Sequence, residues 1–78
     1  MNEKQNEGME IVEIDSDFIR LDSLLKLGGG VVTGGQAKYP IQDGEVKVNG
    51  NVCTMRGKKM RDGDMAEYQG IKYLVRAR

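Results

Sequence analysis

The spacing of apolar residues along the chain follows two different periods. In the first half, apolar residues recur every three or four positions, which is typical of an amphipathic helix with one buried stripe. From residue 46 onward they alternate with polar residues, as in a strand that buries one face. This pattern predicts one short strand, then two helices, then three or four short strands.

The first helix is predicted to follow a short strand over residues 10–14. Residues 15–17, Asp-Ser-Asp, offer three candidate N-caps and place negative charge at the helix start. Three glycines at 28–30 are expected to end the helix, because glycine adopts the left-handed conformation at little cost. The apolar stripe that faces the core is formed by Phe18, Leu21, Leu24 and Leu25.

The second helix is predicted to run from its N-cap, Thr33, to about Asp43. Ala37 and Ile41 face inward at positions i and i+4. Pro40 conflicts with this assignment, because a proline inside a helix removes one backbone hydrogen bond and clashes with the preceding turn. Either the helix begins late, which would place Pro40 near its first turn, or it is kinked there.

A hairpin opens the second half of the chain. Val46 and Val48 are expected to face inward and Lys47 outward. The Asn-Gly pair at 49–50 indicates a two-residue type I′ turn, because both positions of that turn need a positive φ. On the return strand, Val52 is expected to face inward as well.

A basic loop is predicted over residues 56–61, with Met60 as its inward anchor. A turn at 62–64 and two strands, over 65–68 and 71–75, complete the chain. The predicted fold class is therefore α+β, with the two helices packed on a small, mostly antiparallel sheet that contains the hairpin.

The length of the chain allows one domain at most. Residues 1–8 are polar and aperiodic, so we expect a disordered acidic tail there. Residues 9–78 are expected to form a single domain that contains the hairpin over 46–52.

The residue types present argue against several classes of function. The chain has no His and a single cysteine, Cys53, so neither a disulfide, nor a zinc site, nor a base-activated thiol is expected. The glycines at 28–30 and 34–35 fit neither a P-loop nor a dinucleotide-binding unit, so we expect no cofactor and no small-molecule substrate. No apolar run is long enough to span a membrane and no signal peptide is evident, so we expect a soluble cytoplasmic protein that is not an enzyme.

The net charge of zero conceals an uneven distribution. The first 17 residues sum to about −5, and the remaining 61 sum to about +5. Between residues 46 and 61 there are five basic residues and no acid. Asymmetry of this kind points to a polyanionic partner for the basic part of the chain. The alternative is that the cations are only solvated surface.

The basic residues can share one rim of the domain if the two helices pack side by side against the hairpin. Such a rim would be a footprint for a phosphate backbone. Aromatic residues are scarce, which disfavours a reader of single strands and favours recognition of shape and phosphate, as in structured RNA. Spacing alone does not choose between DNA and RNA. The candidate cations are Arg20, Lys26, Lys38, Lys47, Arg56, Lys58, Lys59 and Arg61.

Several segments of the chain resemble the alpha-L RNA-binding motif. This domain was first named for a small-subunit ribosomal protein and also occurs in pseudouridine synthases and a tyrosyl-tRNA synthetase. The likeness is greatest to small free-standing bacterial proteins made of this domain alone, and it covers roughly residues 10–76. The segments that carry it are LDSLLK (21–26), TGGQAK (33–38), GEVKVNG (44–50), RGKK (56–59) and GD (63–64).

The resemblance implies an RNA-binding module for ribosomal or other structured RNA, acting in ribosome assembly or quality control. We expect a monomer without the pseudouridine synthase activity of larger relatives, since no catalytic domain is attached. Tyr39-Pro40 departs from the motif, which usually has two ordinary apolar residues there. The residues that the resemblance places at or near the RNA-facing edge are Lys26, Thr33, Lys38, Lys47, Asn49, Arg56, Lys58 and Lys59.

A protein-interaction module is the alternative function, docking through its sheet edge or hairpin with the cations as rim charges. The two functions differ in their response to salt. Binding to RNA weakens steeply as salt rises, because counterions are released from the phosphates. An apolar protein interface would depend on salt far less.

Overall fold

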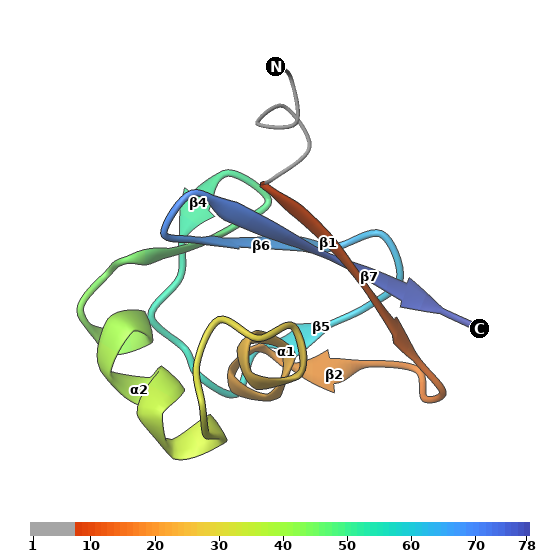
Figure 1. The fold of residues 1–78 in the computed structure, drawn as a ribbon, viewed down its shortest axis with the longest axis horizontal. Helices are drawn as coiled ribbons and strands as arrows, with labels where there is room; N and C mark the ends of the chain where they lie inside the picture. The colour runs from red at the N-terminus through yellow and green to blue at the C-terminus, as the bar shows by residue number, and fades with distance from the viewer. Residues whose placement is uncertain (1–7) are drawn as a thin grey trace.

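The computed structural model describes residues 8–78 and confirms the α+β fold class (Figure 1). The expected tail at residues 1–8 falls, except for Gly8, outside the described residues. Five strands follow the second helix, more than expected, because the basic loop itself contains a two-residue strand. The elements in chain order are β1 (Met9–Ile14), β2 (Ile19–Arg20), α1 (Leu21–Leu27), α2 (Gly34–Gln42), β3 (Val46–Val48), β4 (Asn51–Val52), β5 (Lys59–Met60), β6 (Met65–Tyr68) and β7 (Ile71–Ala77).

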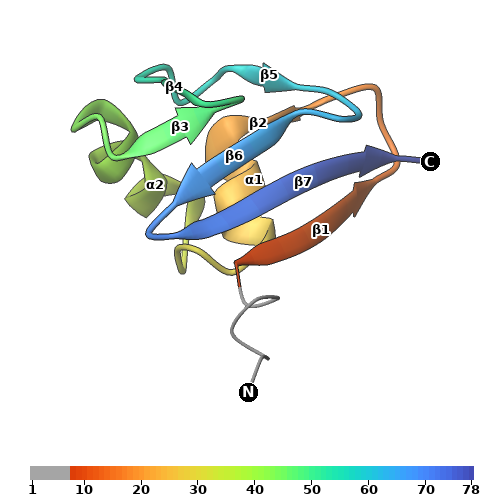
Figure 2. The ribbon, with the colours of Figure 1, turned by 90° about the horizontal axis from the view of Figure 1, so that it is seen from above.

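The main sheet has five strands in the order β1-β7-β6-β3-β4. β1 and β7 are parallel and the other neighbours are antiparallel, so the sheet is mostly antiparallel, as predicted. Both helices lie on one face of this sheet, together with a two-stranded ribbon formed by β2 and β5 (Figures 1 and 2). We call the opposite face the outer sheet face; no helix of residues 8–78 covers it.

The core lies between the helices and the sheet, and it contains most of the apolar positions predicted to be buried. The leucine stripe of α1 is confirmed for Leu21, Leu24 and Leu25, and Met60 is the buried anchor of the basic loop. The largest fully buried side chains are Tyr73, Leu21, Leu24, Leu25, Ile41, Met60, Val46 and Val75.

The hairpin between β3 and β4 has the predicted turn, with φ of 50° at Asn49 and 89° at Gly50. Val46 and Val48 are buried and Lys47 is exposed, also as predicted. The prediction for Val52 is wrong, because its side chain is 57% exposed. Val52 is paired directly with Lys47, and directly opposed residues of an antiparallel pair share a face. A two-residue turn therefore carries Val52 outward with Lys47.

The start of α1 differs from the prediction. The helix begins at Leu21 with Arg20 as N-cap, so Asp15, Ser16 and Asp17 are not its caps. Phe18 precedes the helix and is not part of its apolar stripe. The cause is the short strand β2, whose pairing with the distant β5 leaves no trace in the local sequence pattern.

The second helix begins where it was predicted. Thr33 is its N-cap, and the Thr33 hydroxyl oxygen accepts a hydrogen bond from the Gln36 backbone N–H at 3.1 Å. The helix starts at Gly34, so the alternative of a late start is wrong. Pro40 lies inside the helix and is buried, two residues before the last helical residue, Gln42.

The glycines that end α1 have a packing role besides their conformational one. Gly29 has a φ of 90°, which permits the chain to turn away from the helix. A Cβ on Gly28 would collide with the ring of the buried Tyr73, and a Cβ on Gly30 would lie 2.7 Å from the Tyr73 hydroxyl. The glycine run therefore both stops α1 and leaves space for the largest side chain of the core.

Candidate nucleic-acid interface

The basic loop, residues 56–61, caps the N-terminus of α1. The first N–H groups of an α-helix have no partner within the helix, and Arg20 offers no side-chain cap here. Instead, the Leu21 N–H donates to the Lys58 carbonyl at 2.9 Å, and the Asp22 N–H donates to the Arg56 carbonyl at 3.0 Å. These two bonds fix the backbone of the basic loop against the helix.

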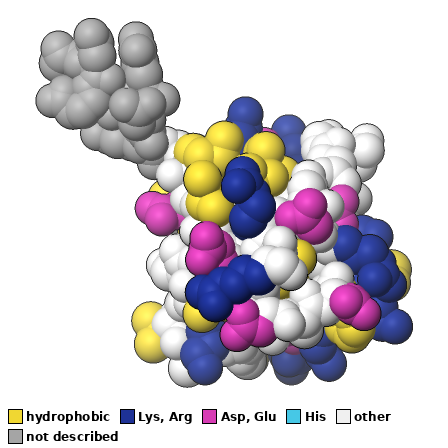
Figure 3. Space-filling view, turned by 90° about the vertical axis from the view of Figure 1, so that its right-hand side faces the viewer, with side chains coloured by type: hydrophobic (Ala, Val, Ile, Leu, Met, Phe, Trp, Pro, Cys, Tyr) yellow, Lys and Arg dark blue, Asp and Glu magenta, His cyan; other side chains and the backbone are white. Residues whose placement is uncertain are grey.

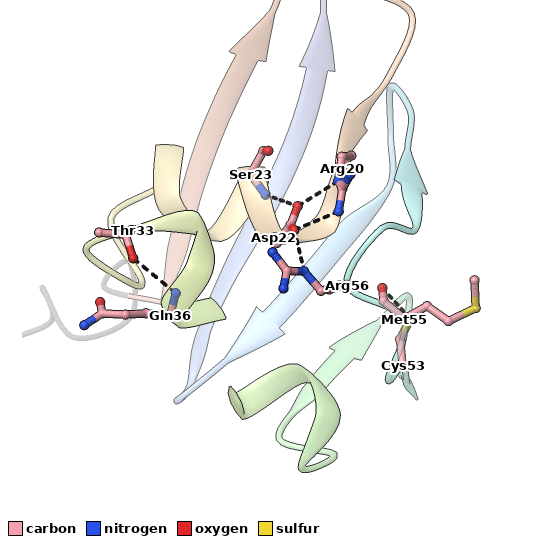
Figure 4. Close-up of polar contacts among 8 residues, drawn as sticks. All are labelled: Arg20, Asp22, Ser23, Thr33, Gln36, Cys53, Met55 and Arg56. Carbon is pink, nitrogen blue, oxygen red and sulfur yellow. Dashed lines mark hydrogen bonds and ion pairs between the residues drawn. The ribbon is translucent and has the colours of Figure 1, made fainter. Parts of the chain in front are cut away.

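Asp22 joins two arginines at this helix start (Figure 4). Arg20 makes a bidentate contact with the Asp22 carboxylate, in which Nε donates to Oδ1 at 3.1 Å and Nη2 donates to Oδ2 at 3.0 Å. Arg56 donates from Nε to Oδ2 at 3.0 Å, and the Ser23 N–H donates to Oδ1 at 2.8 Å. The Asp22 side chain is only 6% exposed, whereas those of Arg20 and Arg56 are 52% and 37% exposed. The carboxylate is thus buried beneath two partly exposed guanidinium groups.

The electrostatic balance around Asp22 favours the ionised carboxylate. Burial raises the pKa of Asp22, but hydrogen bonds from Arg20 and Arg56, the charge of Arg20 and the Ser23 N–H together lower it below its usual value of 3.8. Asp22 is therefore negatively charged at neutral pH. Two guanidinium groups contact this one carboxylate, so the three side chains together have a net charge of about +1.

Two more cations of the basic loop meet at one aromatic ring. Lys59 Nζ lies 5.0 Å from the centre of the Phe18 ring, and Arg61 Cζ lies 5.7 Å from it. In the β2–β5 ribbon, Lys59 is paired with Arg20. The structure thus brings together five of the predicted site residues, which we call the basic cluster: Arg20, Arg56, Lys58, Lys59 and Arg61.

The other predicted cations lie elsewhere. Lys47 is on the outer sheet face, since its neighbours in β3 point into the core, whereas the β2–β5 ribbon lies on the helix side (Figure 1). Lys26, near the end of α1, borders a shallow hollow of about 320 Å³ lined also by Ile19, Ser23 and Leu27. Lys38 is half-buried on α2, with its ammonium 5.3 Å from the centre of the Tyr39 ring.

Thr33 and Asn49 use their side chains within the protein. The Thr33 hydroxyl caps α2, as described above. Asn49 Oδ1 accepts from the Met65 N–H at 3.0 Å, and Asn49 Nδ2 donates to Asp64 Oδ1 at 3.2 Å. Asn49 therefore links the hairpin turn to the turn at residues 62–64 that precedes β6.

The end of the molecule seen in Figure 3 carries both signs of charge. Basic and acidic side chains are interspersed over this face, and apolar side chains gather toward the outer sheet face at the top of the view. Met9 and Ile11 of β1 are exposed apolar residues, and they alternate with the buried Val12 and Ile14, which places them on the outer sheet face. Within residues 8–78, no group of three or more His, Cys, Asp or Glu side chains could hold a metal ion. No helix of that part is long and apolar enough to cross a membrane.

Two residues of the site were not identified from the sequence. Asp22 was not singled out in the sequence, and Phe18 was assigned to the apolar stripe of the first helix. Hydrophobic periodicity carries no signal for either role, because both roles depend on the basic loop, which lies more than thirty residues later in the chain. The Arg-Leu-Asp order at 20–22, which places an acid two residues after a basic residue, was the available local hint.

Comparison with known proteins identifies related sequences. The family model described as "S4 domain" matches residues 12–76. The chain is also similar to the "Probable ribosome maturation protein RlbA" of Bacillus subtilis (strain 168), with 37% identity over 60 residues, which cover 77% of this chain and 84% of that protein. The matched region contains both helices, the hairpin and the whole basic cluster. The chain belongs to the S4 domain family.

Proposed function

We propose that this protein binds ribosomal RNA through the basic cluster. The observation that supports this most strongly is the gathering of five cations around the β2–β5 ribbon, where backbone bonds, one buried carboxylate and one aromatic ring fix their positions. Cations that neutralise phosphates release counterions, which supplies much of the affinity for a nucleic-acid backbone. Residues that are already held in place lose less side-chain entropy on binding.

The chemistry of the cluster favours structured RNA over an unpaired strand. Single-strand readers offer exposed aromatic faces on which successive bases stack. The aromatic ring beside the basic cluster, that of Phe18, is instead approached by Lys59 and Arg61. The guanidinium and ammonium groups of the basic cluster suit phosphates that a folded RNA presents at fixed spacing.

The family and the relative suggest where such binding would act. The similar protein of Bacillus subtilis is named as a probable ribosome maturation protein, so we propose a role in ribosome assembly or quality control. The proposed activity is binding, without catalysis. Lys26, Thr33, Lys38, Lys47 and Asn49 stay predicted contacts of this interface, with the basic cluster as its centre.

Co-sedimentation tests the proposal. The purified protein would be mixed with ribosomal subunits and with fully assembled ribosomes over a series of salt concentrations and then centrifuged. We expect it to pellet with ribosomal particles at low salt and to be released as salt rises, because its contacts are to phosphates. Absence from every particle at low salt, or binding that salt leaves unchanged, would contradict RNA binding through the basic cluster.

One feature favours protein docking as a second candidate function. Met9, Ile11 and Val52 are exposed apolar residues of the main sheet, and exposed apolar surface can mark an interaction site. Binding to a ribosomal particle that persists at high salt, and that is lost on replacing Ile11 with Ser, would support docking through the sheet. Loss of binding with rising salt supports RNA.

A further inference from the structure

All the hydrogen-bond acceptor positions of the Asp22 carboxylate are occupied by protein donors. A carboxylate has about four acceptor positions, and Asp22 accepts four hydrogen bonds: two from Arg20, one from Arg56 and one from the Ser23 N–H. Its backbone N–H is bound to the basic loop as well. The carboxylate therefore cannot turn without breaking several bonds, and it fixes the direction of both guanidinium groups.

Most N–H donors of the Arg20 and Arg56 guanidinium groups, in contrast, are not used in these contacts with Asp22. Each guanidinium carries five N–H groups; Arg20 uses two of them on Asp22 and Arg56 uses one, so three and four remain. Within the described part of the chain, no protein acceptor takes the remaining ones. The backbone of Gly57 lies beside Arg20, where a Cβ would stand 3.6 Å from Nη2. No side chain from this position of the basic loop screens the guanidinium from a ligand.

The charge of this group is unbalanced. One arginine in a forked contact would be sufficient to neutralise a buried carboxylate, yet two arginines converge on Asp22. Two like charges held on one carboxylate repel each other, and a second anion placed between the guanidinium groups would relieve that repulsion. The group therefore has the charge, the free donors and the exposure that a bound phosphate needs.

We propose that Arg20 and Arg56 form a built site for one phosphate of the RNA backbone, and that Asp22 is the positioning residue that aims both guanidinium groups at it. This inference rests on the proposed function and names the phosphodiester as the group that the site holds. Forked N–H donors match phosphate oxygens in geometry as well as in charge. Lys58, Lys59 and Arg61 then supply charge around this oriented contact.

Asp22→Asn gives a test in which positioning and bulk charge predict opposite results. The substitution removes one negative charge and so raises the net charge of the protein by one, and this change in charge alone would tighten binding to RNA. If Asp22 aims the arginines, affinity for purified ribosomal RNA falls instead, by roughly tenfold, which is the value of about one charge-assisted hydrogen bond. The slope of log K against log[salt] also becomes shallower, by about 0.7–0.9 for one lost phosphate contact. Asp43→Asn makes the same charge change at the exposed end of α2 and is expected to bind as the parent or slightly more tightly.

A second pair of variants covers the case in which Asp22→Asn does not fold, as judged by thermal unfolding. Arg20→Lys and Arg56→Lys keep the positive charge but replace the planar guanidinium and its fixed N–H donors by a single ammonium group. Each variant is therefore expected to bind RNA several-fold more weakly. Arg76→Lys, on the exposed surface of β7, is the matched control. If both lysine variants bind as the parent does, the positioned site is wrong.

The outcomes separate this inference from the function on which it rests. If the parent and Asp43→Asn bind RNA, and Asp22→Asn binds equally well or more tightly, the positioned phosphate site is overturned while RNA binding stands. If neither the parent nor Asp43→Asn binds ribosomal RNA at low salt, both proposals fail together.

Discussion

The basic loop and the β3–β4 hairpin both carry exposed cations, but the protein surrounds those cations differently. On the hairpin, Lys47 is paired with Glu67, which is paired in turn with Lys72, so charges of opposite sign alternate across the outer sheet face. In the basic cluster, Arg20 and Arg56 share the acid Asp22, and Lys59 and Arg61 meet at the Phe18 ring. We infer that the placement of counter-charges, rather than the number of cations, is what sets the proposed phosphate-binding surface apart from a surface of mixed charge.

The two regions also differ in what determines their structure. The hairpin follows from local chemistry, since Asn49 and Gly50 both adopt the positive φ that a type I′ turn requires. The basic loop has only one short strand of its own and is held by distant contacts: the helix start, the β2–β5 pairing and the buried Met60. Changes in the core beneath the loop are therefore expected to have the largest effects.

The largest expected effect is on stability, from Met60→Ala. Met60 is the fully buried residue of the basic loop, and truncating a buried methionine leaves a cavity that costs about 2–5 kcal/mol of unfolding free energy. Met55→Ala is the matched control, because Met55 is 63% exposed; it is expected to change stability by less than about 0.5 kcal/mol. Urea unfolding of both variants measures the difference. Equal losses would mean that Met60 does not anchor the loop.

A smaller loss is expected from Gly50→Ala in the hairpin. Gly50 has a φ of 89° and no atom within 4 Å of the position that a Cβ would take, so the penalty is one of backbone conformation alone, roughly 1–2 kcal/mol. Gly35→Ala is the control, because Gly35 lies in α2 and its Cβ would make only an ordinary contact; it is expected to be neutral or stabilising. RNA affinity is expected to change little in either variant, because neither substitution removes a charged side chain.

The smallest stability effect is expected from Asp22 in acid. Because the pKa of Asp22 is lower in the folded protein than its usual 3.8, its contribution is fully present above about pH 4–5 and is lost as the pH falls through the folded pKa. The parent is therefore expected to lose more stability than Asp22→Asn between neutral pH and about pH 3, as measured by urea unfolding. An identical acid response in the parent and Asp22→Asn would show that the ion pairs add nothing to stability.

Local sequence patterns were sufficient to predict that the two helices exist, where α2 begins and the turn of the hairpin. The leucine period, the Thr33 cap and the Asn-Gly turn each act within a few residues, so their consequences can be derived without knowledge of the fold. The sequence also contained enough to correct one error. A two-residue turn at 49–50 pairs Val52 with Lys47, and this register alone places Val52 on the outer sheet face.

The site itself could be predicted only in part. The basic residues of the loop were identified from their spacing, but their arrangement depends on contacts between residues far apart in the chain, such as Arg56 with Asp22 and Lys59 with Phe18. The start of α1 at Leu21 could not be predicted for the same reason, since its first N–H groups are capped by the basic loop. Residues that have no local partner became interpretable only in the folded chain.

The most direct test of the central claim compares two double variants that remove equal charge. Lys58→Ala with Lys59→Ala removes two cations of the basic cluster, and Lys72→Ala with Arg76→Ala removes two exposed cations of β7. RNA affinity would be measured over a salt series for the parent and both variants. The account predicts that the first variant binds ribosomal RNA weakly, with a slope of log K against log[salt] that is shallower by about 1.5 units, while the second binds nearly as the parent. Equal losses in the two variants would show that binding follows net charge alone and that the basic cluster is not the RNA-binding surface.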